Sequence, residues 1–69
     1  MRLSARNQIR GTVTHVEVGA VTTTVKVQLG GGDTVTSSIT REAAEELGVE
    51  VGSEVTVVVK ASDVLLAVD

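Results

Sequence analysis

Several residue types on which small proteins rely are missing from this chain of 69 residues, which has no cysteine, no proline and no aromatic residue. Without cysteine there is no disulfide, and a single histidine leaves a structural zinc site without enough ligands. A chain of this length buries only about 60% of the surface that its unfolded form exposes, so its own core gives marginal stability. Association with other copies is the remaining route to a stable fold.

Positive charge is also scarce, because six Lys and Arg residues face nine Asp and Glu residues and give a net charge of −3. Binding to a nucleic acid depends on clustered basic residues and, in many small barrels, on aromatic side chains that stack against bases. The composition therefore disfavours a nucleic-acid partner. A small anion held by a few local donors remains compatible with it.

Long hydrophobic runs are absent. The amino terminus, "MRLSARNQIR", lacks the apolar stretch of a signal peptide, and no segment approaches the ~20 apolar residues of a membrane-spanning helix. We therefore expect a cytoplasmic protein without a membrane partner. No linker, repeat or low-complexity tract divides the chain, so residues 1–69 are predicted to form one domain.

Alternation of apolar and polar residues predicts strands. "VTTTVKVQL" alternates without a break, and "GGGD" can adopt the positive φ angles of a hairpin turn before "TVTSSI" alternates again. The apolar positions change parity between Val13 and Val16, which predicts a bulge in a long first strand. The expected strands are residues 7–18, 21–29, 34–39, 55–61 and 64–68.

One segment has the period of a helix, "TREAAEELG" at residues 40–48, with Thr40 as its cap and Gly48 as its left-handed stop. Three strands, a helix and two strands is the order of the OB-fold, so we predict a small all-β protein, a five-stranded OB-fold-like barrel with one short helix between strands three and four. Residues 57–59 and 64–67 are apolar on both faces, and this pattern predicts cover from another subunit.

Nothing in the sequence supports catalysis. His15 stands alone, "GGGDTVTSS" lacks the lysine and the following helix of a phosphate-binding loop, and the glutamates of the helix are typical of a solvated face. No nucleophile is accompanied by a base and an orienting acid. We therefore expect a binding protein and not an enzyme.

Three segments contain more hydrogen-bond donors than their structure requires: "SARN" at residues 4–7, "TSS" at 36–38 and "KAS" at 60–62. Together they offer several hydroxyls, two cations and backbone N–H groups at strand ends, and they contain no acidic residue. Such a set suits a fully deprotonated oxyanion, because that ligand only accepts hydrogen bonds. A protonated anion such as hydrogen phosphate needs an acceptor and is disfavoured.

The stretches "SARNQIRG", "TSSIT" and "VKASDVLLAV" resemble the molbindin family, the Mop domains related to TOBE domains, over nearly the whole chain. The resemblance implies a cytoplasmic protein that binds molybdate or tungstate for storage and homeostasis. It implies an OB-type barrel assembled as a hexamer, a trimer of dimers, with anions between subunits and no direct protein ligand to the metal. The alternative is a module that senses molybdate and acts on a protein partner.

The family's anion-binding residues carry over to ten positions of this sequence: Ser4, Ala5, Arg6, Asn7, Thr36, Ser37, Ser38, Lys60, Ala61 and Ser62. One position departs from some family members, which place a hydroxyl directly after the lysine where this chain has Ala61. A backbone N–H is therefore the expected donor at that position.

Overall fold

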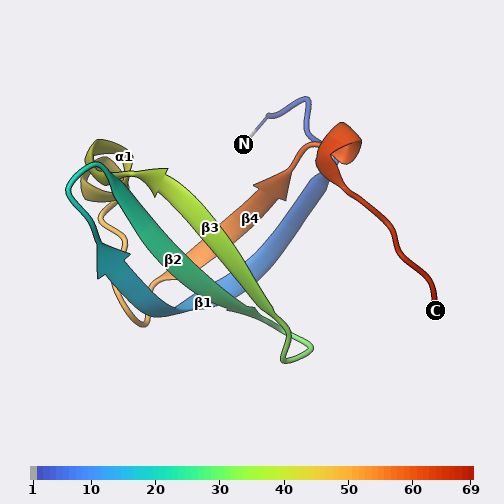
Figure 1. The fold of residues 1–69 in the computed structure, drawn as a ribbon, viewed down its shortest axis with the longest axis horizontal. Coiled ribbons are helices and arrows are strands. Elements are labelled where there is room, and N and C mark those ends of the chain that lie inside the picture. Colours follow the sequence, from blue (N-terminus) through green and yellow to red (C-terminus); the bar gives the residue numbers. More distant parts are fainter. Residues whose placement is uncertain (1) are drawn as a thin grey trace.

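The computed structural model describes residues 2–69 and shows a four-stranded antiparallel sheet with the strand order β3-β2-β1-β4 (Figure 1). A short helix links β3 to β4, and a single 3-10 turn follows β4. The elements in chain order are β1 (Asn7–Val18), β2 (Thr22–Leu29), β3 (Thr34–Thr40), α1 (Arg41–Leu47), β4 (Glu54–Val59) and η1 (Ala61–Asp63).

β1 is the strand that shapes the sheet. Its first half, Asn7 to Thr12, pairs with β4, and its second half, Gly11 to Val18, pairs with β2. The register shifts between Val13 and His15, which confirms the predicted bulge and bends the strand there. The sheet therefore curls into a half-barrel, with β2 and β3 on one side and β4 on the other (Figure 1).

The core lies inside this curl and consists of aliphatic side chains. Val13, Val25 and Val27 are buried, and half-buried residues from every strand and from the segment after α1 pack against them, namely Val16, Leu29, Ile39, Val49, Val55 and Val57. Valine suits this position because its β-branched side chain favours strands. The alternation predicted for β2 and β3 is confirmed, since their inward positions are the buried or half-buried ones.

Thr23 is the one polar side chain within residues 2–69 that is fully buried, and its hydroxyl has no hydrogen-bond partner there. An unsatisfied buried hydroxyl costs about 1–3 kcal/mol. Thr23→Val replaces it with a methyl group of similar shape, so we expect the free energy of unfolding to rise by about 1 kcal/mol. Thermal unfolding followed by circular dichroism would detect this as a midpoint higher by roughly 4–8 °C. A lower midpoint would mean that the hydroxyl is bonded in the assembled protein.

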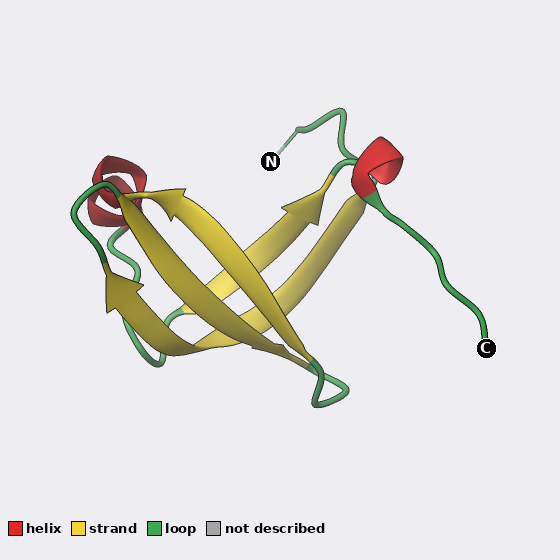
Figure 2. Cartoon of the chain, in the orientation of Figure 1, coloured by secondary structure: helices red, strands yellow, loops and turns green. Residues whose placement is uncertain are grey.

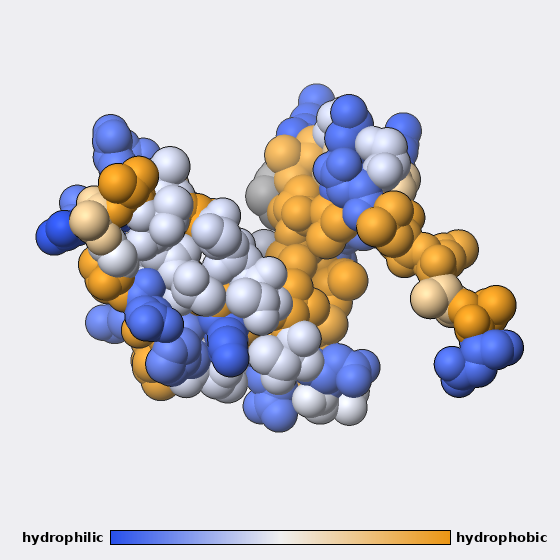
Figure 3. Space-filling model, viewed as in Figure 1, coloured by the Kyte–Doolittle hydropathy of each residue, from blue (hydrophilic) through white to orange (hydrophobic). Residues whose placement is uncertain are grey.

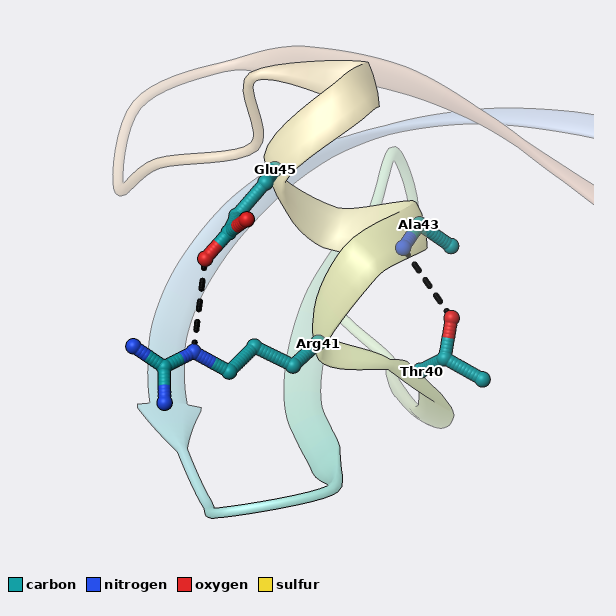
Figure 4. A network of polar contacts seen from close by, with 4 residues as sticks. All are labelled: Thr40, Arg41, Ala43 and Glu45. Carbon is teal, nitrogen blue, oxygen red and sulfur yellow. Dashed lines mark hydrogen bonds and ion pairs between the residues drawn. The ribbon is translucent and has the colours of Figure 1, made fainter.

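α1 has the two boundaries that the sequence predicts, and Figure 4 shows the first of them, the Thr40 cap. The Thr40 hydroxyl accepts a hydrogen bond from the backbone N–H of Ala43 at 3.0 Å, and Gly48 ends the helix in the left-handed conformation with a φ of 64°. Arg41 and Glu45 pair across one turn at 3.3 Å. In the part of the chain that the structure describes, no helix has the length and apolar character needed to cross a membrane.

The fifth strand predicted for residues 64–68 is not formed, so the prediction of a five-stranded barrel within one chain is wrong in this respect. A strand needs a neighbouring edge to pair with, and η1 turns the chain away from the sheet directly after β4 (Figure 2). Residues 64–69 leave η1 as an extended, exposed tail. β4 also ends at Val59, so Lys60 and Ala61 belong to the turn instead of the strand.

Candidate functional site

Two of the three donor-rich segments lie together where β1 begins and β4 ends (Figure 2). Asn7 is directly opposite Val59 in the antiparallel register, and its side-chain amide donates a hydrogen bond to the Val59 carbonyl at 3.1 Å. Residues 4–7 precede this pair and residues 60–62 follow it. We call these two segments, residues 4–7 and 60–62, the donor cluster.

Local hydrogen bonds fix the backbone on both sides of the donor cluster. The η1 turn is closed by bonds from the Asp63 N–H to the Lys60 carbonyl at 2.8 Å and from the Val64 N–H to the Ala61 carbonyl at 3.2 Å. The Gln8 side-chain amide lies 3.4 Å from the Ala5 carbonyl. Gln8 was not among the predicted site residues, although it stands in the "SARNQ" stretch, and this contact links it to the first segment.

The donor cluster keeps two cations without an acidic partner. Arg10 pairs with Glu54 at 3.1 Å and Arg41 pairs with Glu45, whereas neither Arg6 nor Lys60 takes part in an ion pair among residues 2–69. Both side chains are exposed, as are Ser4, Ala61 and Ser62, while Ala5 and Asn7 are half-buried. Two cations that take part in no ion pair among the described residues therefore lie at this end of β1 and β4, although the whole chain is acidic.

The third donor-rich segment lies elsewhere in the chain's own fold. Thr36 to Ser38 pair with Lys26 to Thr24 of β2, and these in turn lie opposite His15 to Glu17 of β1. Roughly 25 Å of extended strand separates that part of β1 from Asn7. Thr36 and Ser38 are exposed, while Ser37 is half-buried and faces the inner side of the curl together with Val35 and Ile39.

A single chain therefore brings together seven of the ten predicted anion-binding residues and leaves the other three on the edge strand β3. Most of the donor cluster is open to solvent. Its exposed donors are the Arg6 guanidinium, the Lys60 ammonium and the hydroxyls of Ser4 and Ser62, which are groups that donate hydrogen bonds to anions. Asn7 is placed to hold β1 against β4, since its amide already donates to Val59.

Comparison with known sequences finds the TOBE domain model over residues 3–66. Molybdenum-pterin-binding protein 3 of Clostridium pasteurianum is 47% identical over 66 residues, which cover 96% of this chain and 97% of that protein. A probable molybdenum-pterin-binding protein of Haemophilus influenzae is 39% identical over 69 residues and matches over the full length of both chains. The similarity therefore includes the donor cluster and β3.

The same fold occurs in solved structures. MopII from Clostridium pasteurianum, in an apo form, superposes with a TM-score of 0.91 at 43% identity and covers 97% of this chain and 100% of its own. The cytoplasmic molybdate-binding protein ModG, with molybdate bound, superposes with a TM-score of 0.95 at 48% identity. This chain is matched over its whole length and corresponds to 49% of ModG.

Proposed function

Because this chain belongs to the TOBE domain family, we propose that it binds molybdate as an intact oxyanion and stores it in the cytoplasm. The observation that carries the proposal is the donor cluster, where Arg6 and Lys60 have no acidic partner among residues 2–69 and stand in the same two segments as the hydroxyls of Ser4 and Ser62. Molybdate is a tetrahedral dianion that only accepts hydrogen bonds, so a site made of donors and cations matches it.

In the proposed site the Arg6 guanidinium and the Lys60 ammonium supply the charge, and charge-assisted hydrogen bonds supply most of the affinity. The hydroxyls of Ser4 and Ser62 and the backbone N–H groups of Ala5 and Ala61 orient the oxygens. The molybdenum atom has no direct protein ligand. Binding then involves no bond making or breaking, which agrees with a carrier that releases its cargo unchanged.

We further propose that the site is completed between subunits. The donor cluster is largely open to solvent, and Thr36 and Ser38 are exposed on β3, away from the cluster of their own chain. A second copy can bring its β3 hydroxyls to the donor cluster of the first. The family resemblance points to a hexamer built as a trimer of dimers, which repeats such contacts by symmetry.

The absence of aromatic residues favours a compact oxyanion over a pterin as the ligand. The relatives are named for a molybdenum pterin, but this chain has no aromatic residue on which a pterin ring could stack. The exposed donors of the cluster fit a compact anion better than a flat heterocycle. Tungstate has nearly the same size and charge as molybdate, so we propose that it binds to the same site.

Native mass spectrometry with and without molybdate tests this function, with sulfate at the same concentration as the control. We expect one oligomer that takes up several molybdates or tungstates and no sulfate, because donors closed around the larger anions by a second subunit would fit the smaller sulfate poorly. A monomer or dimer whose mass is unchanged by molybdate would contradict both the ligand and the position of the sites between chains.

A sensing module that acts on a protein partner is the second candidate, and the exposed apolar tail after η1 is the observation that favours it. A sensor must change its partner-binding surface when the anion binds. Hydrogen exchange of residues 64–68 with and without molybdate separates the two functions. Storage predicts that the tail of the oligomer is protected from hydrogen exchange both with and without molybdate. Sensing predicts that this protection changes when molybdate is added.

A further inference from the structure

The outer face of the sheet carries a row of polar side chains that crosses three strands. Lys26 of β2 lies directly opposite Thr36 of β3 on one side and His15 of β1 on the other, and all three residues are exposed. The neighbours of Lys26 along β2, Val25 and Val27, are buried in the core, so the row faces away from the curl. Figure 3 shows mostly pale surface of intermediate hydropathy over β2 and β3, which agrees with their many threonines and serines. The row therefore places a cation beside one of the β3 hydroxyls.

The charge of Lys26 is not neutralised within the described chain. Lys26 takes part in no ion pair among residues 2–69. The acid diagonal to it on β1, Glu17, lies 4.0 Å from the Nε2 atom of His15 instead. An unpaired lysine on a protein surface is ordinary by itself. The position of Lys26 next to Thr36 is therefore the observation that carries the argument.

The Lys26 ammonium and the β3 hydroxyls can reach the same ligand. Residues directly opposite each other in an antiparallel pair have Cβ atoms about 4.5–5.5 Å apart, which is the relation of Lys26 to Thr36. Ser38 lies diagonally to Lys26 on the same face. The lysine stem is long and flexible, so its ammonium reaches past the neighbouring side chain. An anion that accepts a hydrogen bond from Thr36 would lie within reach of Lys26 as well.

Lys26 cannot serve the donor cluster of its own chain. Lys26 is paired with His15, and about 25 Å of extended strand separates His15 from Asn7, where the donor cluster begins. The β3 hydroxyls are equally distant, and in the proposed function they reach an anion only in a second copy. Lys26 would travel with them, because the pairing of β2 with β3 fixes the two positions side by side.

We propose that Lys26 of one copy is a third cation for the molybdate bound in the donor cluster of another copy. This inference rests on the proposed function and adds a residue that the proposed site does not contain. Arg6 and Lys60 come from one chain and Lys26 comes from the other, so positive charge faces the dianion from both subunits. Charge-assisted hydrogen bonds are stronger than neutral ones, so Lys26 contributes more than the hydroxyls beside it.

Isothermal titration calorimetry of Lys26→Gln with molybdate at fixed ionic strength tests the inference. We expect the dissociation constant to rise about tenfold, the lower end of the range for a hydrogen bond to a charged group, because Lys26 is exposed. Lys26→Arg keeps the charge and should retain most of the affinity. Arg10→Gln is the matched control, since it removes the same charge from an exposed residue that is paired with Glu54. Its dissociation constant should stay within about twofold of the parent.

Mixed assemblies show which chain supplies Lys26. The Arg6→Ala and Lys26→Gln proteins are unfolded together, refolded together and titrated with molybdate. If Lys26 acts on another copy, about a quarter of the sites combine an intact Arg6 with an intact Lys26 after random mixing, and these sites bind with the parent affinity. If both residues act within one chain, every site carries one defect and no parent-like site appears.

Two results would overturn the inference. One is a Lys26→Gln protein that binds molybdate within about twofold of the parent, and the other is a mixed assembly without parent-like sites. In both cases a parent protein that binds molybdate leaves the proposed function intact. A parent protein that binds no molybdate would overturn the proposed function and this inference together.

Discussion

Replacing Arg6 by alanine should weaken molybdate binding by about ten- to a hundredfold, because a hydrogen bond to a charged group contributes about 1.5–3 kcal/mol. The Arg6 side chain is exposed at the donor cluster and has no acidic partner within residues 2–69, so its charge is available to an anion. The change also removes a fork of donors that lysine cannot reproduce. Isothermal titration calorimetry with molybdate at fixed ionic strength measures the effect.

Arg10→Ala is the matched control for this experiment. Arg10 lies four residues further along the chain, is exposed on β1, and is paired with Glu54 at 3.1 Å instead of facing the donor cluster. Its removal changes the net charge by the same amount, so a general effect of charge would appear in both variants. We expect the dissociation constant of Arg10→Ala to stay within about twofold of the parent. Equal losses in the two variants would remove Arg6 from the site.

Much of the fold could be predicted because local patterns determine it. The parity shift between Val13 and Val16 located the bulge of β1, and the glycines of residues 30–32 located the turn between β2 and β3. Thr40 and Gly48 marked both ends of α1 correctly. In each case the signal and the structure that it specifies lie within a few residues, so no knowledge of distant parts of the chain is needed.

The fifth strand could not be placed in this way. The sequence of residues 64–68 is that of a buried strand, but a strand forms only against an edge, and the pattern does not say which chain provides it. The candidate site could be predicted only in part for the same reason, because its segments meet through strand pairing between distant parts of the chain. Spacing in the sequence does not reveal that "SARN" and "KAS" meet at the Asn7 and Val59 pair while "TSS" lies on the opposite edge strand.

The missing fifth strand and the half-open donor cluster have one physical origin. A chain this small exposes both edges of its sheet, an apolar tail and a half-open set of donors. Each of these is costly or ineffective in a monomer, and in the proposed oligomer each would be covered by another copy. An anion bound between copies would also stabilise the assembly, since a ligand that binds only the assembled state shifts the equilibrium towards it.

The sheet next to the donor cluster depends on Gly11 of β1. Gly11 pairs with Leu29 of β2 on one side and with Val55 of β4 on the other. A Cβ atom at this position would lie 2.5 Å from Val27 Cγ1 and 2.8 Å from the backbone oxygen of Gln28. Gly11→Ala should therefore lower the free energy of unfolding by about 1–3 kcal/mol through overpacking. The gain of about 0.4–1 kcal/mol from a less flexible unfolded chain is smaller than this cost.

Thermal unfolding measures the Gly11 effect, and a loss of about 1–3 kcal/mol corresponds to a midpoint lower by roughly 5–20 °C in a domain of this size. Gly30→Ala is the matched control, because a Cβ atom there meets nothing within 4 Å and Gly30 is not among the glycines with positive φ. We expect that variant to unfold at or slightly above the parent midpoint. A Gly11→Ala protein as stable as the Gly30→Ala protein would show that β1 can move away from Val27 and Gln28.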